Sequence, residues 1–340
     1  MQRLALIILA LLLLIFTIMP GCSQFKSAKR LDFAPFAEYT IGLAMDIEFG
    51  LVQRQKIKYL RPYLDDPVVK ENRAEWDKVR ELLRGVVAYS VELTTLGSST
   101  LSGRERCRAL AEFIENVAGP SIRTRKGRLH ITPAELDSIV AEVRGRKDLL
   151  EGLAAVQPII DEVARVSEDI FDEVKESLDR TATHLSQRID EDNSDVTLYE
   201  VLIRQTTYNT FRTFILLRQY RTGDDAALDE MFELDPQLRE YSRSGDSLTD
   251  SEIQAVEDRL VQKAQFTKEL MEQIQTDIDH YYAQQDELAE LYSFANLQLR
   301  KAKVTLIVWM RAHRDLARGI TDPAKINLFD LTKKAAKTVM

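Results

Sequence analysis

The chain of 340 residues is 45% hydrophobic and 29% charged, which is ordinary for a folded protein with a sizeable core. Its net charge of −8 at pH 7 argues against general nucleic-acid binding, since nucleic-acid-binding surfaces are basic. With only 13 glycines and 9 prolines, the sequence lacks the turn density of an all-β or disordered chain, and its apolar spacing favours helices.

The first residues of the chain differ from everything that follows. Arg3 precedes the apolar run Leu4–Met19, which is interrupted only by Thr17, and Pro20-Gly21 then ends any helix. A positive start, a short apolar segment and small residues at the cleavage point are the parts of a secretory signal peptide. Because spanning a bilayer takes about 20 apolar residues, this shorter run favours a cleaved signal. The alternative is an uncleaved membrane anchor.

The residues at the predicted cleavage point define the kind of signal. The segment Met19-Pro20-Gly21-Cys22 resembles the cleavage box of bacterial lipoprotein signal peptides, although that family prefers Leu and a small residue where Met19 and Pro20 stand. The resemblance, which ends at residue 24, implies cleavage before Cys22 and acylation of this cysteine. Several acyl chains would anchor the protein without a spanning helix. Ser23 resembles the signal that sends such proteins to the outer membrane, facing the periplasm.

Three helices are predicted after a short polar tether at 22–32. Their apolar residues recur at threes and fours over 33–60, 68–96 and 102–117. The third helix begins at the capping box Ser102–Glu105, in which each side chain bonds the backbone N–H of the other residue. Gly119-Pro120 is expected to end this helix.

The segment 122–131 has a different pattern, in which charged residues alternate with apolar or β-branched ones around Lys126-Gly127. This alternation is compatible with a small β-hairpin whose turn lies at that pair. Four cations in the segment form a candidate anion-binding site for phosphate or carboxylate groups: Arg123, Arg125, Lys126 and Arg128. The alternative is a solvated loop that binds nothing.

Capping residues and helix breakers divide the next part of the chain. Thr132–Glu135 is a second capping box and opens a helix that ends near Gly145. The helical pattern resumes over 147–191, where Pro158 lacks a backbone N–H and should kink the helix. After the expected cap at Asn193-Ser194, two more helices are predicted, over 195–221 and 225–233.

Residues 249–318 contain neither proline nor glycine and form the longest predicted element, about 100 Å of helix at about 1.5 Å per residue. A third capping box, Thr249–Glu252, opens it. Apart from Thr267, an apolar residue recurs at every seventh position: Ile253, Leu260, Ile274, Tyr281, Leu288, Ala295, Ala302, Trp309 and Leu316. A second apolar seam drifts, which suits an antiparallel bundle better than a coiled coil, with 147–191 and 195–221 as partner helices.

The sequence contains no motif with recognisable chemistry. Zinc-protease, di-iron, serine-hydrolase and phosphate-loop patterns are all missing. Asp277 and His280 share a helix face, but a surface hydrogen bond accounts for this pair better than a metal site. We therefore expect no catalytic residue, no metal and no enzyme activity. The aromatic residues of the long helix fit a bundle core, or else the lining of a ligand cavity: Tyr281, Tyr282, Tyr292, Phe294 and Trp309.

These patterns predict an all-α protein, an elongated antiparallel helical bundle with one very long C-terminal helix. The expected divisions are a signal peptide, a tether and two helical regions, at 1–21, 22–32, 33–145 and 146–340. The first hypothesis for function is a lipid-anchored interaction or scaffold module in the bacterial cell envelope, whose partner is an envelope protein or a second copy. The alternative is a binding protein that carries an apolar ligand between its helices. The lipid on Cys22 is the only non-protein group expected.

Overall fold

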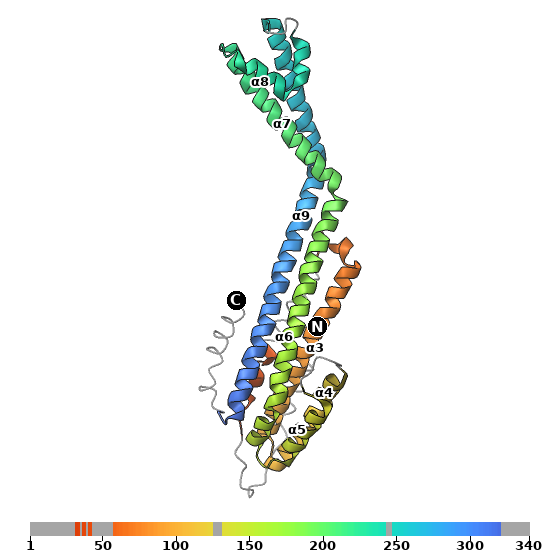
Figure 1. Ribbon diagram of the computed structural model, residues 1–340, viewed down its shortest axis with the longest axis vertical. Helices are drawn as coiled ribbons and strands as arrows, with labels where there is room; N and C mark the ends of the chain where they lie inside the picture. The colour runs from red at the N-terminus through yellow and green to blue at the C-terminus, as the bar shows by residue number, and fades with distance from the viewer. Residues whose placement is uncertain are drawn as a thin grey trace, which may run out of the picture. The chain divides into compact units, whose positions relative to one another are not determined.

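A computed structural model describes residues 31–34, 36–38, 40–42, 57–124, 131–242 and 247–320, with the backbone alone for 117–124. All regular structure in these residues is helical, and no strand occurs among them (Figure 1). The predicted all-α class and the very long C-terminal helix are therefore confirmed.

The order of the helices follows the predicted order closely. The elements are η2 (Arg61–Tyr63), α3 (Pro67–Ser98), α4 (Gly103–Thr124), α5 (Pro133–Gly145), α6 (Leu149–Asp192), α7 (Ser194–Arg221), α8 (Ala226–Leu234), η3 (Pro236–Tyr241) and α9 (Asp250–Ala317). Of the predicted helix over 33–60, the described residues between 34 and 42 are helical, 43–56 lie outside the described part, and the predicted end is wrong because 57–60 are not helical. Residues 1–30 and 321–340 also lie outside it.

The contacts group the chain into two compact units, each built from separate stretches of sequence. The first unit takes the described residues of 1–40, 85–162 and 309–331. The second takes those of 41–84 and 163–308. Three helices, α3, α6 and α9, therefore contribute residues to both units.

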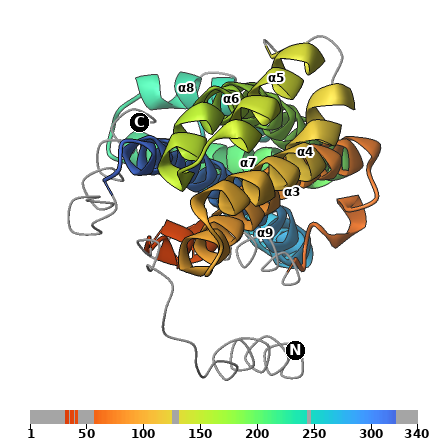
Figure 2. The same ribbon diagram turned by 90° about the horizontal axis from the view of Figure 1, so that it is seen from below.

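In the first unit, α4 and α5 lie side by side (Figure 2). The start of α4 lies so close to the loop before α6 that a Cβ atom on Gly103 would be 2.1 Å from the carbonyl oxygen of Lys147. The Cys107 thiol donates to the carbonyl oxygen of Asp148 at 3.2 Å. Burial raises the pKa of this thiol to about 11, so Cys107 remains protonated at neutral pH.

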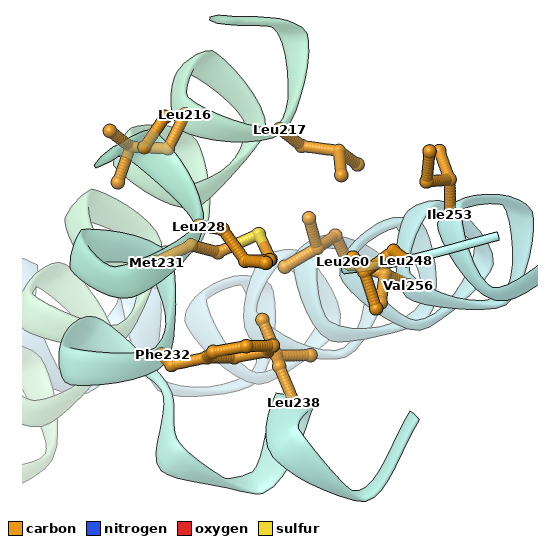
Figure 3. Close-up of a cluster of buried hydrophobic side chains, with 11 residues drawn as sticks. Leu216, Leu217, Leu228, Met231, Phe232, Leu238, Leu248, Ile253, Val256 and Leu260 are labelled. Carbon is orange, nitrogen blue, oxygen red and sulfur yellow. The ribbon is translucent and has the colours of Figure 1, made fainter. Parts of the chain in front are cut away.

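The second unit contains a compact apolar cluster that joins the end of α7 to α8, η3 and the start of α9 (Figure 3). Its buried members are Leu216, Leu217, Ala227, Leu228, Met231, Phe232, Leu238, Leu248, Ile253, Val256 and Leu260. All lie within a short stretch of sequence, so the cluster forms from nearly local contacts. Two ion pairs brace the same region, Arg212–Glu230 and Arg221–Glu257, each at 2.7 Å.

The segment before α3 is attached to α9 through one carboxylate. Glu287 Oε1 accepts the backbone N–H of Lys58 at 2.8 Å, and Glu287 Oε2 accepts those of Tyr59 and Leu60 at 2.7 Å each. A smaller apolar cluster lies beside this attachment and contains Leu60, Tyr63, Leu185 and Ile189.

All three predicted capping boxes are present. Ser102–Glu105, Thr132–Glu135 and Thr249–Glu252 each show the reciprocal bonds between side chain and backbone. The prediction that Asn193-Ser194 caps the next helix is wrong, because the expected side-chain bond is not made. Asn193 occupies the N-cap position of α7, but its side chain donates back to the Ile189 carbonyl at 2.8 Å and makes no cap bond. The backbone of Asn193, with φ −116° and ψ 19°, is not in the extended conformation that N-cap residues usually adopt.

The predicted end of the third helix at Gly119-Pro120 is also wrong, because α4 continues through this pair to Thr124. A proline removes only one helical hydrogen bond, so a helix can continue through it, as α6 does at Pro158. Consequently Ile122, Arg123 and Thr124 lie in the last turn of α4 and not in a strand. The rest of the suggested hairpin, 125–130, lies outside the described residues.

The seven-residue register of α9 is confirmed along its whole length. No register position is exposed, from Ile253 to Leu316, and the polar exception Thr267 is buried too. The Thr267 hydroxyl donates to carbonyl oxygens of its own helix, at 3.1 Å to Lys263 and 3.0 Å to Ala264. This bonding explains how a hydroxyl can stand in an otherwise apolar line.

Candidate interaction surface on α7

Helix α7 has an apolar outer face, which we define by six residues that are exposed and mostly aliphatic or aromatic. Its members are Leu198, Val201, Leu202, Tyr208, Phe211 and Ile215. The exposed fractions of Val201, Tyr208 and Phe211 are 63%, 62% and 64%, so the face is open over three turns. Single exposed apolar residues are ordinary, but several on one side of a helix mark an interaction site, and Val201, Tyr208, Phe211 and Ile215 recur on one side of α7.

The inner side of α7 is more polar than its outer face. Thr210 and Thr213 are buried, and their hydroxyls donate to the carbonyl oxygens of Thr206 and Asn209 at 2.7 Å each. Glu200 is buried as well and accepts the Tyr282 hydroxyl of α9 at 3.2 Å. Of the large apolar side chains in the middle of α7, Ile203 is buried, whereas Tyr208 and Phe211 are exposed.

Helix α7, which carries the outer face, is held in place at both ends. At the C-terminal end of α7, Leu216 and Leu217 are almost fully buried in the cluster of Figure 3, against Met231 of α8. At the N-terminal end, only Asn193 separates α7 from α6. Both ends fix the helix, so its outer face is a preformed surface.

Charged residues flank the outer face with opposite signs at its two ends. Asp195 lies one turn before Leu198, and Arg218 lies one turn after Ile215. Both are exposed, and neither has an ion-pair partner within the part of the chain that the structure describes. The helix dipole favours this order, with the acid near the N-terminus and the base near the C-terminus.

The other notable cluster is a buried polar network in the first unit. His313 Nε2 lies 2.7 Å from the Tyr89 hydroxyl, and His313 Nδ1 lies 2.9 Å from Gln157 Oε1. The Gln157 amide nitrogen donates to Asp161 at 2.7 Å, so its oxygen faces the ring as an acceptor. This arrangement assigns the proton to Nδ1 and makes the tyrosine hydroxyl the donor to Nε2.

This network is closed to solvent at its centre. His313 and Tyr89 are buried, and burial lowers the histidine pKa to about 3 and raises the tyrosine pKa. Nearby, the Trp309 indole donates to the Ser90 hydroxyl at 2.9 Å. The buried groups here, Tyr89, Ser90, Trp309 and His313, all have partners, and only Gln157 and Asp161 lead from them to the surface, so the network orders the core.

Most of the candidate site residues predicted from the sequence lie outside the residues that the structure describes. Cys22 and three of the four candidate anion-binding cations, Arg125, Lys126 and Arg128, lie outside the described residues. Arg123 lies in the last turn of α4, where only the backbone is described. The predicted lipid and anion sites therefore stay predictions.

The aromatic residues of α9 do not gather at one site. Trp309 belongs to the first unit, whereas Tyr281, Tyr282 and Tyr292 belong to the second. These three tyrosines donate to carboxylates of α6 and α7, namely Asp190, Glu200 and Asp179. His280 packs edge-on against the Tyr59 ring, with centroids 5.5 Å apart.

The residues that the structure describes contain neither a membrane-spanning helix nor a cluster of metal ligands. No helix in those ranges combines the length and hydropathy that a bilayer crossing requires. No group of three or more histidine, cysteine, aspartate or glutamate side chains in the same residues could hold a metal ion. Comparison of the chain with known protein families, curated proteins and solved structures found no match.

The outer face of α7 was not predicted from the sequence, although the sequence holds a signal for it. The apolar residues of 195–221 occupy two sides of the helix, more than one buried face requires. Tyr199, Leu202 and Phe211 are exposed. Ile203, Leu216 and Leu217 are buried, and Phe214 is partly buried against the cluster of Leu216 and Leu217.

Proposed function

We propose that this chain is a lipid-anchored interaction module of the bacterial cell envelope, and that it contacts proteins through the outer face of α7. The observation that carries the contact function is the run of exposed apolar side chains from Leu198 to Ile215 on a helix fixed at both ends. Tyrosine and phenylalanine, which are enriched in protein interfaces, are the most exposed members apart from Val201.

The anchoring part of the proposal rests on the first residues of the chain. The apolar run that ends at Met19, followed by Cys22, supports acylation of the cysteine and attachment to the outer membrane on its periplasmic side. With several acyl chains, the attachment is durable, because each buried CH₂ group contributes about 0.8 kcal/mol. A body held in this way stays near the membrane while α7 engages a partner.

One experiment in bacterial cells tests both parts. The full chain is expressed with a photo-crosslinking amino acid at Tyr208, and the membrane-extracted protein is analysed by intact mass. We expect a native chain that begins at Cys22 and carries acyl groups, whereas a Cys22→Ala version has none. An unacylated native chain that retains residues 1–21 would contradict the lipid anchor.

The same samples report on the contact function. Illumination should join the Tyr208 position to a protein and give a discrete adduct of higher mass. A matched position is Val261 of α9, which is 55% exposed but lies off the α7 face, and there we expect little adduct. Equal yields at the two positions, or none at Tyr208, would show that α7 is not a contact surface.

A further inference from the structure

One side of α7 carries residues at the alternating three- and four-residue spacing by which one helix pairs with another. We define this line as the outer seam, and its members are Val201, Arg204, Tyr208, Phe211, Ile215 and Arg218. With about 3.6 residues per turn, the directions of all six fall within a sector of about 100°. All six residues are exposed, so the described part of the chain leaves the seam uncovered over its full length.

A second line of residues on α7 has the same spacing and packs inside the unit. Ile203, Thr210 and Leu217 lie seven residues apart and are buried, as is Thr213 between them. Each of the first three follows a member of the outer seam by two residues, which turns it about 160° away. Helix α7 therefore has two packing lines on nearly opposite sides, and only the inner one is covered by described residues.

The charge of the outer seam indicates the chemistry of its partner. Residues 201–221 contain four arginines and no acidic residue, in a chain whose net charge is −8. Arg204 pairs with Glu200 at 2.5 Å, but the Glu200 side chain is 7% exposed and that of Arg204 is 68% exposed, so a partner meets the guanidinium. Arg218 is exposed and has no ion-pair partner among the described residues. Carboxylates are the groups that complement both arginines.

A second copy of the seam does not supply these carboxylates. Antiparallel pairing of two seams about their centre sets Arg204 against Ile215 and Arg218 against Val201, and parallel pairing sets each arginine against itself. A flat anionic bilayer also fits less well, because exposed acidic residues of α8 lie beside α7, where Glu230 pairs with Arg212. A single helix, about 10 Å wide, covers the seam alone.

We propose that the outer seam binds one amphipathic helix of another protein, with apolar residues at seven-residue spacing and aspartate or glutamate facing Arg204 and Arg218. This inference rests on the proposed function, because it states the chemistry of the partner that α7 contacts. The apolar side chains of the partner remove Tyr208, Phe211 and their apolar neighbours from water. Its carboxylates form charge-assisted hydrogen bonds with the two guanidinium groups.

Two designed peptides of about three heptads serve as probes for this partner. Both have leucine at the a and d positions, and the flanking e and g positions are glutamate in one and lysine in the other, so that each peptide repels its own copies. The purified full chain, held in nanodiscs of zwitterionic lipid, is titrated with each labelled peptide, and empty nanodiscs give the blank. We expect the acidic peptide to bind about tenfold more tightly than the basic one. Equal affinities, or no binding of the acidic peptide, would overturn the proposal.

A charge-reversing variant with a matched control locates the binding. Arg218→Glu should weaken binding of the acidic peptide about tenfold and strengthen binding of the basic one, because the new carboxylate repels the first and attracts the second. Lys268→Glu makes the same change of charge at an exposed residue of α9, and both peptides should bind it as they bind the native chain. Equal effects of the two variants would show that the peptide does not bind at the seam.

A second pair of variants tests the apolar part of the contact. Phe211→Glu places a charge in the middle of the seam and should abolish binding of the acidic peptide, whereas Val261→Glu on α9 should leave it unchanged. The two side chains are 64% and 55% exposed, so the helical circular dichroism and the melting temperature should remain native in both. Native affinity in Phe211→Glu would contradict the proposal.

The remaining outcomes distinguish this inference from the function on which it rests. A Tyr208 adduct in cells without binding of the acidic peptide would exclude the acidic helix and keep the contact function. A native dimer in sedimentation equilibrium that Phe211→Glu dissociates would assign the seam to a second copy instead. Binding to phosphatidylglycerol vesicles that the same variant loses would assign it to lipid. Absence of both peptide binding and any Tyr208 adduct would exclude the surface function itself.

Discussion

His313 shows how one residue can be fully paired and still make the fold sensitive to pH. Its ring is neutral in the folded protein, since Nε2 accepts from Tyr89 and Nδ1 donates to Gln157. Protonation of Nε2 would break the bond from Tyr89 and place a charge in a buried site. Burial accordingly lowers the pKa of His313 to about 3.

This pKa predicts a loss of stability in weak acid. An unfolded histidine has a pKa of about 6.5, so between this value and about 3 the unfolded chain binds more protons than the folded one. The contribution of neutral His313 to the free energy of unfolding is complete above about pH 6.5. It decreases as the pH falls, by up to about 1.4 kcal/mol per pH unit. His313→Gln should flatten the pH dependence of the free energy of unfolding, measured by urea titration between about pH 6.5 and about pH 5. An unchanged slope in the variant would contradict this assignment.

At the scale of single elements, two glycines with opposite surroundings make a matched test. Gly85 lies inside α3, and nothing is within 4 Å of the place where a Cβ atom would be. Gly85→Ala should therefore raise the free energy of unfolding by about 0.5–1 kcal/mol, through higher helix propensity. Gly103→Ala should lower it by about 1–3 kcal/mol, because the new Cβ would be 2.1 Å from the Lys147 oxygen and the backbone must move.

Chemical denaturation of the two alanine variants beside the native chain checks the pair. Both changes add one methyl group. The difference between their effects on the free energy of unfolding therefore isolates the effect of the neighbouring backbone. Destabilisation of similar size in both variants would show that α4 does not approach Lys147 as closely as the structure indicates.

Elements governed by local chemistry could be predicted from the sequence. The capping boxes at Ser102, Thr132 and Thr249 are complete within four residues, and each was found where expected. The α9 register could also be predicted, because nine apolar residues at seven-residue spacing outweigh one Thr267. The end of α4 could not be predicted, since a Gly-Pro pair disfavours continuation of a helix but does not prevent it.

The candidate site depended on information that periodicity does not contain. A helical pattern identifies apolar residues but does not decide which of two apolar sides is covered. In α7, Leu216 and Leu217 are buried because α8 packs on them, whereas Phe211 and Tyr208 have no such neighbour. Likewise, the Tyr89–His313 bond joins residues 224 positions apart, and neither residue has a local sequence signal for it.

At the scale of the whole molecule, the first unit depends on the last part of α9. Trp309, Ala312, His313 and Leu316 are all at most 2% exposed, and the indole and the imidazole bond to α3. The network around Tyr89 is therefore incomplete without residues that come from the far end of the described chain.

A chain that ends after Val308 tests this dependence. We expect the backbone amides of 85–162 to lose protection from hydrogen exchange, because the core around Tyr89 would open to water. The amides of 216–260 should keep theirs, since the cluster of Figure 3 contains no residue beyond Leu260. Full protection over 85–162 in the shortened chain would contradict the assigned role of Trp309 and His313.

The position of these residues has a consequence for the order in which the protein forms. Synthesis proceeds from the N-terminus, and contacts between distant residues form more slowly than local ones. The cluster from Leu216 to Leu260 can assemble as soon as its own stretch is made. Tyr89, by contrast, waits more than 200 residues for His313. If the proposed lipid anchor is correct and the chain is exported before it folds, this delay keeps the core around Tyr89 open until His313 has been delivered.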